Sequence, residues 1–263
     1  MTESHHPNLP ITRDGDIATV TFNRPEARNA FNLSMWQGLA DTMAALSADD
    51  TLRCVILRGS GPESFSAGAD IKGFETERGT AASEAIYARV FHDGMQSVRL
   101  CQHPVVAAIE GVCMGGGAGI ATMCDFRVGD IGIRMGITAC KLSLWYPYAE
   151  IAPVIALVGS AVVTEMLIEG RIFNGREAYE KGLLSRLAAD GKVQEEALAL
   201  AGRIAEGAPL AARFHKAAIR RLGEGGPITE AEELASSGFA LTEDFQGAVQ
   251  AFKARRKPVW HGR

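Results

Sequence analysis

The sequence predicts an α/β fold that continues into a helical C-terminal region. Short apolar runs of strand length alternate with longer amphipathic stretches up to about residue 190, as expected where helices connect parallel strands. Residues 193–254 then fit a helical pattern almost throughout, with breaks near 207–209 and 223–227. We therefore expect a core over residues 1–190 and a helical region over residues 191–263.

The composition narrows the classes of function. The chain has 263 residues, of which 47% are hydrophobic and 22% charged, and its net charge is −4. This length supports one large domain with a sizeable core, and the charge predicts no nucleic-acid partner. No apolar run approaches the length of a membrane span, so we expect no membrane partner. The first residues carry no export or organelle signal, which favours a cytoplasmic protein.

The first elements follow from short-range patterns. Residues 1–10 are polar and contain proline, so we expect a loose tail. Ile17–Phe22 alternates apolar with small polar residues, which predicts a strand. A helix should follow, capped by Asn32 or Ser34. Cys54–Leu57 is a short apolar run and predicts a second, buried strand.

The middle of the chain repeats this alternation. Ser83–Leu100 is amphipathic and predicts a long helix leading into a central strand over Val105–Ile109. Short strands are expected at Phe126–Val128 and Ile133–Gly136. The later elements are apolar helices over 149–158 and 161–168 separated by Gly159, a short helix over 175–181, and a strand over 184–187.

The stretch from Pro104 to Asp125 is the most informative part of the sequence. It combines the central strand with Gly115, Gly116 and Gly117, followed by small and apolar residues. Three glycines permit a tight turn into a helix N-terminus, where unpaired N–H groups face outward with the helix dipole behind them. Such a corner can bind an anion or an oxygen that becomes anionic during a reaction. Close packing alone could equally require these glycines.

The cysteines indicate no metal site and no disulfide framework. They are odd in number, scattered, and without C-x-x-C spacing, so we interpret them as reduced residues of the core. They are Cys54, Cys101, Cys113, Cys124 and Cys140.

Five motifs, taken together, resemble the crotonase (enoyl-CoA hydratase/isomerase) superfamily over about residues 11–260. They are residues 22–30, 65–72, 104–125, 165–170 and 251–260, and they occur in the order and at the separations of that family. The resemblance implies a crotonase-like spiral of β-β-α turns, followed by a C-terminal helical region that forms trimers, often stacked as hexamers.

The resemblance also implies acyl-CoA thioester substrates, with coenzyme A entering as part of the substrate and no prosthetic group. By motif position, the backbone N–H groups of Ala69 and Gly116 correspond to the family's oxyanion hole. A thioester that is attacked or deprotonated accumulates charge on its carbonyl oxygen as an enolate. Each aligned donor in such a hole is worth about 3 kcal/mol of barrier.

Four positions match the family's coenzyme A channel. Arg28, Ala67 and Lys72 correspond to residues that line it, and Lys253 corresponds to a C-terminal residue near the nucleotide. Basic side chains there would pair with phosphate oxygens. The three charged residues also fit solvated surface positions.

The sequence departs from the family where hydration needs its two glutamates. The first position is Gly119, and the second is Ala139, or Cys140 if the alignment shifts by one residue. A general acid or base contributes 10²–10⁴ in rate, so we expect a reaction other than simple hydration. A non-catalytic acyl-CoA-binding subunit is the alternative from another class. A dinucleotide-binding turn is disfavoured because the glycine spacing is not G-x-G-x-x-G.

Replacement acids can be named from the family layout. Glu150 lies opposite the expected hole, although a carboxylate at a helix start also fits a structural role. His92 lies on the helix expected to cap the acyl pocket, although an exposed or hydrogen-bonded helix histidine explains the pattern better. Further candidates, each better explained as structural, are Glu75, Glu77 and Tyr148. An aromatic acyl pocket is suggested by Trp145, Tyr146 and Tyr148, which could also belong to the core.

Overall fold

Two sheets organise the chain in the computed structural model, which describes residues 6–263. The larger has six strands in the order β1-β2-β3-β5-β7-β10, and the smaller has four in the order β4-β6-β8-β9. Neighbouring strands are parallel except for the pairs β1–β2 and β8–β9. The larger sheet comprises β1 (Ile11–Asp14), β2 (Ile17–Phe22), β3 (Cys54–Gly59), β5 (Val105–Ile109), β7 (Phe126–Gly129) and β10 (Arg186–Leu187). The smaller comprises β4 (Ser64–Ser66), β6 (Val112–Met114), β8 (Arg134–Gly136) and β9 (Phe173–Asn174).

The chain alternates between the two sheets as it advances. β3, β5 and β7 belong to the larger sheet, and the strand that follows each of them belongs to the smaller one. A helical segment then returns the chain to the start of the next turn. Three successive turns of this kind form the expected β-β-α spiral, so the fold class is confirmed.

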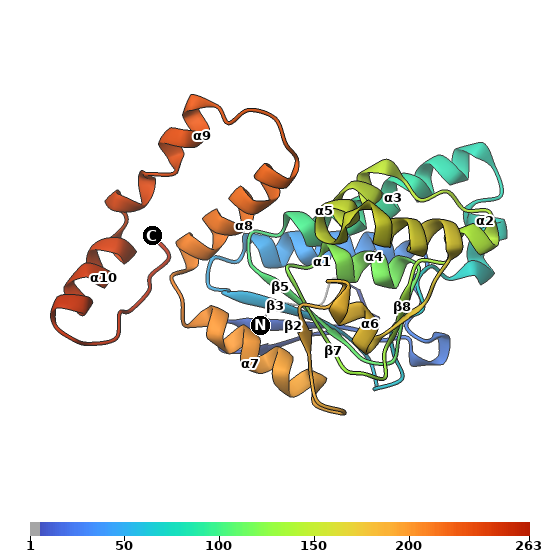
Figure 1. Cartoon of the computed structure of the whole chain (residues 1–263), viewed down its shortest axis with the longest axis horizontal. Helices are drawn as coiled ribbons and strands as arrows, with labels where there is room; N and C mark the ends of the chain where they lie inside the picture. The colour runs from blue at the N-terminus through green and yellow to red at the C-terminus, as the bar shows by residue number, and fades with distance from the viewer. Residues whose placement is uncertain (1–5) are drawn as a thin grey trace.

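Helices cover both faces of the larger sheet (Figure 1). α1 (Leu33–Ala48), α3 (Ala81–Leu100), α4 (Gly116–Met123) and α5 (Tyr148–Thr164) lie on one side, and α7 (Val193–Ala205) lies on the other. All five residues of β5 are buried, as expected for a strand between two helical layers. Short helices α2 (Phe74–Glu77) and α6 (Gly175–Glu180) complete the core, with 3₁₀ turns at Pro25–Ala27, Ile71–Gly73 and Ala139–Leu142.

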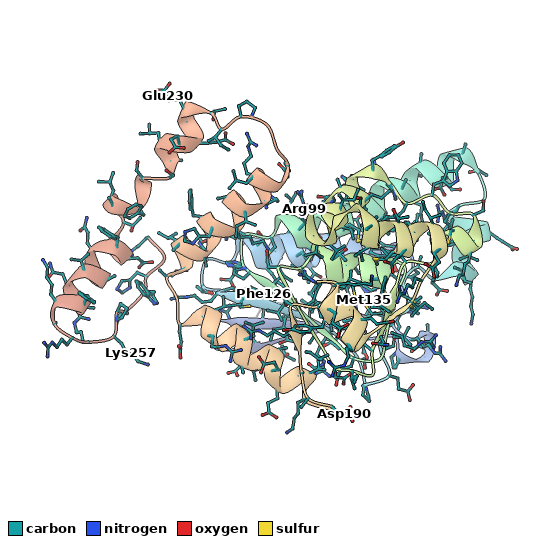
Figure 2. The ribbon with its side chains drawn as sticks, in the orientation of Figure 1. Arg99, Phe126, Met135, Asp190, Glu230 and Lys257 are labelled. Atoms are coloured by element: carbon teal, nitrogen blue, oxygen red, sulfur yellow. The ribbon has the colours of Figure 1, made fainter. Side chains whose placement is uncertain are left out.

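The last three helices form an arm that projects from the core (Figure 1). They are α8 (Pro209–Gly223), α9 (Glu230–Ala235) and α10 (Glu243–Lys253), with a 3₁₀ turn at Gly238–Leu241. Figure 2 shows Glu230 and Lys257 at opposite ends of this arm, well away from Met135 in the core. The predicted breaks near 207–209 and 223–227 are thus confirmed. α7 packs on the larger sheet, so the core includes residues beyond 190. The division of the chain into a core over residues 1–190 and a helical region over residues 191–263 remains a prediction.

One apolar segment corrects the expectation about membrane spans. Within residues 6–263, Tyr148–Glu169 is long and apolar enough to cross a membrane by length and composition, with a mean hydropathy of 2.1. Its backbone is not one straight helix, because Gly159 has φ 77° and ψ 161° inside α5, and a π turn follows at Glu165–Glu169. The segment also buries the Glu150 carboxylate against the core. Of its most apolar 18-residue window, 22% is buried within the chain.

Other differences from the sequence prediction are local. Residues 1–5 of the predicted loose tail lie outside the described residues, and the rest of the tail is ordered: Leu9 is fully buried, and the Asn8 carbonyl accepts from Asn23 N at 2.9 Å. Asn32, rather than Ser34, caps α1 by accepting from Met35 N. β1, β4 and β6 are additional strands of three or four residues.

Candidate active site

A partly enclosed cavity lies where both sheets and several helices converge. Its volume is about 190 Å³, and its walls come from the loop after β4, from α2 and α3, from the N-terminus of α4 and from residues 137–147. Apolar side chains predominate in the lining, as is usual for a small-molecule site. The lining includes Ala67, Ala69, Phe91, Gly116, Ala139, Tyr146, and the pair Arg78 and Glu84.

Two peptide N–H groups meet at this cavity, although they are 47 residues apart in the sequence. A β-carbon built on Gly116 would lie 3.6 Å from Ala69 N, and one built on Gly68 would lie 2.8 Å from Gly116 N. Gly68 also has φ 94°, which other residues rarely adopt. Within residues 6–263, neither N–H donates to another backbone group. The glycines thus permit close packing and also leave two N–H donors side by side. The two roles considered for the glycine turn from the sequence, close packing and binding of an anionic oxygen, are therefore compatible.

The loop that carries Ala69 is held by the motif at residues 22–30. Arg24 Nη2 pairs with Asp70 Oδ2 at 3.0 Å, and Arg24 Nη1 donates to the Ala30 carbonyl at 2.8 Å. Asn29 is fully buried, and its side chain donates to the Ser64 carbonyl at 2.7 Å. Buried groups satisfied in this way fix backbone geometry. Two motifs distant in the sequence therefore build one rigid turn.

Aromatic rings support the other donor. Only glycine fits at position 116, because a β-carbon there would lie 2.9 Å from Trp36 Cζ2. The Trp36 ring packs against the rings of Phe31 and Phe91, with centroid distances of 4.6 and 4.8 Å. Tyr87 follows in the cavity wall, where burial raises the pKa of its hydroxyl to about 12. The floor under Gly116 is therefore apolar and tightly packed.

A charged pair stands at another part of the wall. The Arg78 guanidinium donates to both oxygens of Glu84 at 2.6 Å and lies over the rings of Phe74 and Tyr87, 4.7 and 4.6 Å from their centroids. The hydrogen bond to Arg78 lowers the pKa of Glu84 and raises that of Arg78. Glu84 is therefore held as a carboxylate and engaged by its partner.

The two positions expected to lack the hydratase glutamates lie in different surroundings. Ala139 lines the cavity, whereas Cys140 is exposed. Gly119 is fully buried in α4, and a β-carbon built there would lie 2.2 Å from Met95 Cε and 2.3 Å from the Tyr146 hydroxyl. A larger side chain at position 119 is excluded unless both neighbours move, and the Tyr146 hydroxyl occupies the space that it would take.

Glu150 and His92, named from the family layout, are brought together by the fold. Glu150 is fully buried near the start of α5, and its Oε1 lies 2.7 Å from His92 Nδ1 on α3. Neither residue lines the cavity, but Tyr146 does. Burial and the charge of Glu150 raise the pKa of the Tyr146 hydroxyl above its ordinary value. Sequence reasoning named Tyr146 only as an aromatic of the pocket, because its proximity to Gly119 and Glu150 is a tertiary feature.

The remaining candidates lie at the edge or outside. Trp145 is 93% exposed at the rim of the cavity, and Tyr148 is 92% exposed and does not line it. Glu75 is exposed, and Glu77 Oε1 accepts from Leu33 N at 3.3 Å, a structural contact. The expectation of an aromatic pocket therefore applies to Tyr146 and does not hold for Tyr148.

The four proposed coenzyme A residues do not converge within one chain. Ala67 lines the cavity, and its N–H donates to the Arg28 carbonyl at 2.9 Å, so these two are adjacent. Arg28 and Lys72 are exposed, as channel residues at a surface would be. Lys253 lies on α10, at the opposite end of the molecule from α2 (Figure 1). Among residues 6–263 there is no group of three or more His, Cys, Asp or Glu side chains able to hold a metal ion.

Comparison with known proteins gives one consistent match. The family model described as enoyl-CoA hydratase/isomerase matches residues 12–263. A solved structure of an enoyl-CoA hydratase/carnithine racemase from Magnetospirillum magneticum has a TM-score of 0.95 and 42% identity, covering 98% of this chain and 97% of that one. The carnitinyl-CoA dehydratase of Salmonella typhi is 30% identical, covering 100% of both chains. The crotonyl-CoA hydratase of Syntrophomonas wolfei is 29% identical, covering 95% of this chain and 96% of that protein.

Proposed function

Because the chain belongs to the enoyl-CoA hydratase/isomerase family, we propose that it binds acyl-CoA thioesters and stabilises a thioester enolate at the N–H groups of Ala69 and Gly116. The observation that carries this proposal is the pair of adjacent peptide N–H groups in the wall of the cavity. Gly116 is also the first residue of α4, so the helix dipole adds positive potential at that point. Donors fixed before reaction stabilise developing charge most effectively.

The proposed reaction differs from simple enoyl-CoA hydration. Hydration needs a group that activates water and a group that handles the α-proton. At the positions that correspond to the family glutamates, Gly119 has no side chain and Ala139 has only a methyl group. The N–H groups of Ala69 and Gly116 would therefore still polarise the thioester carbonyl, whereas no side chain at positions 119 and 139 would activate water.

The first experiment separates binding from hydration. Calorimetric titration with butyryl-CoA should detect binding, whereas crotonyl-CoA should be hydrated at least 10²-fold more slowly than the roughly 10 s⁻¹ of a typical enzyme. Hydration within tenfold of that rate would contradict the reasoning about Gly119 and Ala139. Absence of butyryl-CoA binding would overturn the whole proposal.

The second experiment tests the hole and distinguishes an enzyme from a non-catalytic acyl-CoA-binding subunit. Enolate formation from butyryl-CoA in D₂O incorporates deuterium at the α-carbon, which mass spectrometry measures without knowledge of the natural substrate. Ala69→Pro removes one N–H and should slow the exchange by about 10²–10³, whereas Ala69→Gly keeps the donor and serves as its control. Gly116→Pro is less informative because its ring would collide with Trp36. Binding without any exchange would favour the non-catalytic alternative.

We also propose a homotrimer or homohexamer, in which α8–α10 pack against another copy. Large apolar side chains on this arm remain exposed, including Leu241 at 86% and Phe252 at 85%, and such surfaces usually mark interfaces. Lys253 lies far from the cavity of its own chain, so it would contact coenzyme A only in a neighbouring subunit. Arg28, Ala67 and Lys72 would contact it from the same chain. Free cysteines, four of the five buried, support a cytoplasmic location.

A further inference from the structure

We infer that the cavity takes an acyl group with a neutral hydroxyl beyond its β-carbon, and that the Arg78–Glu84 pair binds this hydroxyl. The inference rests on the proposed acyl-CoA function and names the class of acyl group within it. Arg78 donates to the hydroxyl oxygen, and Glu84 accepts from the hydroxyl. The pair determines specificity and takes no part in the enolate chemistry.

The pair is the charged feature of a mostly apolar wall. Within residues 6–263, Arg78 and Glu84 are the two charged side chains that line the cavity. The hydroxyls of the lining tyrosines, Tyr87 and Tyr146, are buried and offer nothing to a ligand. A few placed polar groups in an apolar site usually fix the orientation and identity of the ligand. An alkyl chain would leave this pair without a partner in the cavity.

Arg78 keeps N–H groups that Glu84 does not use. Its Nε donates to Glu84 Oε2 and its Nη2 to Glu84 Oε1, both at 2.6 Å. A guanidinium has five N–H groups, so three remain, two of them on Nη1. Within residues 6–263, Nη1 makes no hydrogen bond and is not among the buried unpaired atoms, so it is accessible. The Glu84 oxygens each keep a lone pair, and the pair therefore offers both a donor and an acceptor.

The surrounding structure holds the pair in place before a ligand binds. The Arg78 guanidinium lies over the rings of Phe74 and Tyr87, 4.7 and 4.6 Å from their centroids. The Arg78 N–H donates to the Phe74 carbonyl at 2.8 Å. Glu84 lies in the first turn of α3, which the Thr80 side chain caps. Groups fixed in this way lose little conformational entropy when a ligand binds.

A row of rings leads from the proposed oxyanion hole to the pair. Trp36 lies under Gly116, and the centroids of Trp36 and Phe91 are 4.8 Å apart. The rings of Phe91 and Tyr87 stack at 6.4 Å, and Tyr87 lies under Arg78. Phe91 and Tyr87 both line the cavity. An acyl chain whose carbonyl is at Gly116 therefore passes apolar rings before it reaches Arg78, which places the hydroxyl beyond the β-carbon.

The charge balance of the pair favours a neutral group. Glu84 neutralises Arg78, so an acyl carboxylate would bring an uncompensated negative charge beside Glu84, at a cost in desolvation. A quaternary ammonium group binds to aromatic faces, but the guanidinium already covers the rings of Phe74 and Tyr87. A hydroxyl needs no counter-charge and uses the donor and the acceptor together.

Calorimetric titration with matched thioesters tests the preference for a hydroxyl. The hydroxyl ligands are 4-hydroxybutyryl-CoA, 5-hydroxypentanoyl-CoA and 6-hydroxyhexanoyl-CoA. Each is compared with the thioester that has a methyl group in place of the hydroxyl, namely pentanoyl-CoA, hexanoyl-CoA and heptanoyl-CoA. Since hydrogen bonds to charged groups are the stronger ones, at least one hydroxyl ligand should bind about tenfold more tightly than its methyl counterpart. Equal or weaker binding of all three would overturn the inference.

A pair of arginine variants assigns the preference to the cavity. Arg78→Met removes the donors and keeps a long apolar side chain, so the preference for the hydroxyl ligand should be lost. Comparing two ligands on one variant cancels any general effect on thioester binding. Arg99→Met is the matched control, because Arg99 is also 21% exposed, pairs with Glu224 at 2.7 Å and lies outside this cavity. It should keep the preference of the parent. A preference that persists in Arg78→Met would overturn the inference.

Glu84→Gln tests the choice of a neutral group. In the parent, glutaryl-CoA and 4-(trimethylammonio)butyryl-CoA should both bind more weakly than the preferred hydroxyl ligand. Glu84→Gln leaves Arg78 without its counter-charge, so glutaryl-CoA should bind about tenfold more tightly to this variant than to the parent. A gain in affinity is a result that structural damage would not produce. Tighter binding of either charged thioester by the parent, or no gain in Glu84→Gln, would overturn the assignment of a neutral group.

Failure of this inference is distinguishable from failure of the proposed function. If the parent binds butyryl-CoA and exchanges α-deuterium but prefers no hydroxyl ligand, the proposed function stands and the inference is wrong. If the parent binds none of the thioesters, both are wrong. If the parent and Arg99→Met prefer a hydroxyl ligand and Arg78→Met does not, the inference is supported.

Discussion

The substitution Gly119→Ala tests the packing that places Tyr146 beside α4. The new methyl group would lie 2.2 Å from Met95 Cε and 2.3 Å from the Tyr146 hydroxyl, distances at which one of them must move. Overpacking of a buried site costs about 1–3 kcal/mol. Replacing a helical glycine by alanine contributes about 1 kcal/mol in the opposite direction. We therefore expect a net change in stability between about 0 and −2 kcal/mol.

A second glycine separates these two effects. Gly202 lies in α7, and a β-carbon there would have nothing within 4 Å, so Gly202→Ala should gain about 1 kcal/mol from helix propensity alone. The difference between the two variants, about 1–3 kcal/mol, is the packing cost. For a chain of this size it corresponds to about 2–12 °C in the melting temperature.

The assay is thermal unfolding of both variants and the parent at one protein concentration, because assembly would make the midpoint depend on concentration. Adding Tyr146→Phe to Gly119→Ala removes one of the two colliding atoms and should recover part of the loss, which a double-mutant cycle measures. If Gly119→Ala is as stable as Gly202→Ala, the Tyr146 hydroxyl does not occupy this space.

Two further predictions concern stability and assembly. Burial, with a smaller contribution from the charge of Arg213, lowers the pKa of His103 to about 4 in the folded state. As the pH drops, the unfolded chain therefore binds a proton at His103 before the folded chain does. The free energy of unfolding should fall by roughly 3 kcal/mol between pH 6.5 and pH 4. His103→Gln should show a shallower decline in denaturant unfolding across that range, and an unchanged slope would contradict the burial argument. The exposed apolar arm predicts at least a trimer in sedimentation at micromolar concentration, where a monomer would contradict the proposed assembly.

The main strands were predictable because their burial leaves a local signal. β5 is buried on both faces, and its five apolar residues predict its bounds without error. β4 and β6 have only three residues each, too few to show a period. Their presence follows from pairing with each other in the smaller sheet, which no local pattern records.

The candidate site divides in the same way. Gly116 could be singled out within its run of three glycines, because a tight turn and close packing demand glycine, a requirement visible in the sequence. The close approach of Gly68 to Gly116 N appears only in the fold. The neighbours of Gly119 could not be singled out either, because the Tyr146 hydroxyl comes from a residue 27 positions away and reaches α4 only through tertiary packing. Glu150 and His92 were named separately, and only the fold of α3 against α5 joins them as a pair.

The use of main-chain donors separates two kinds of evolutionary change at this cavity. A peptide N–H accompanies every residue except proline, so most substitutions at position 69 leave the donor itself in place, subject to the fit of the new side chain. The groups that handle protons are side chains, and a single substitution can remove, replace or relocate them. A protein built in this way can exchange one proton chemistry for another while its capacity to polarise a carbonyl is inherited with the backbone.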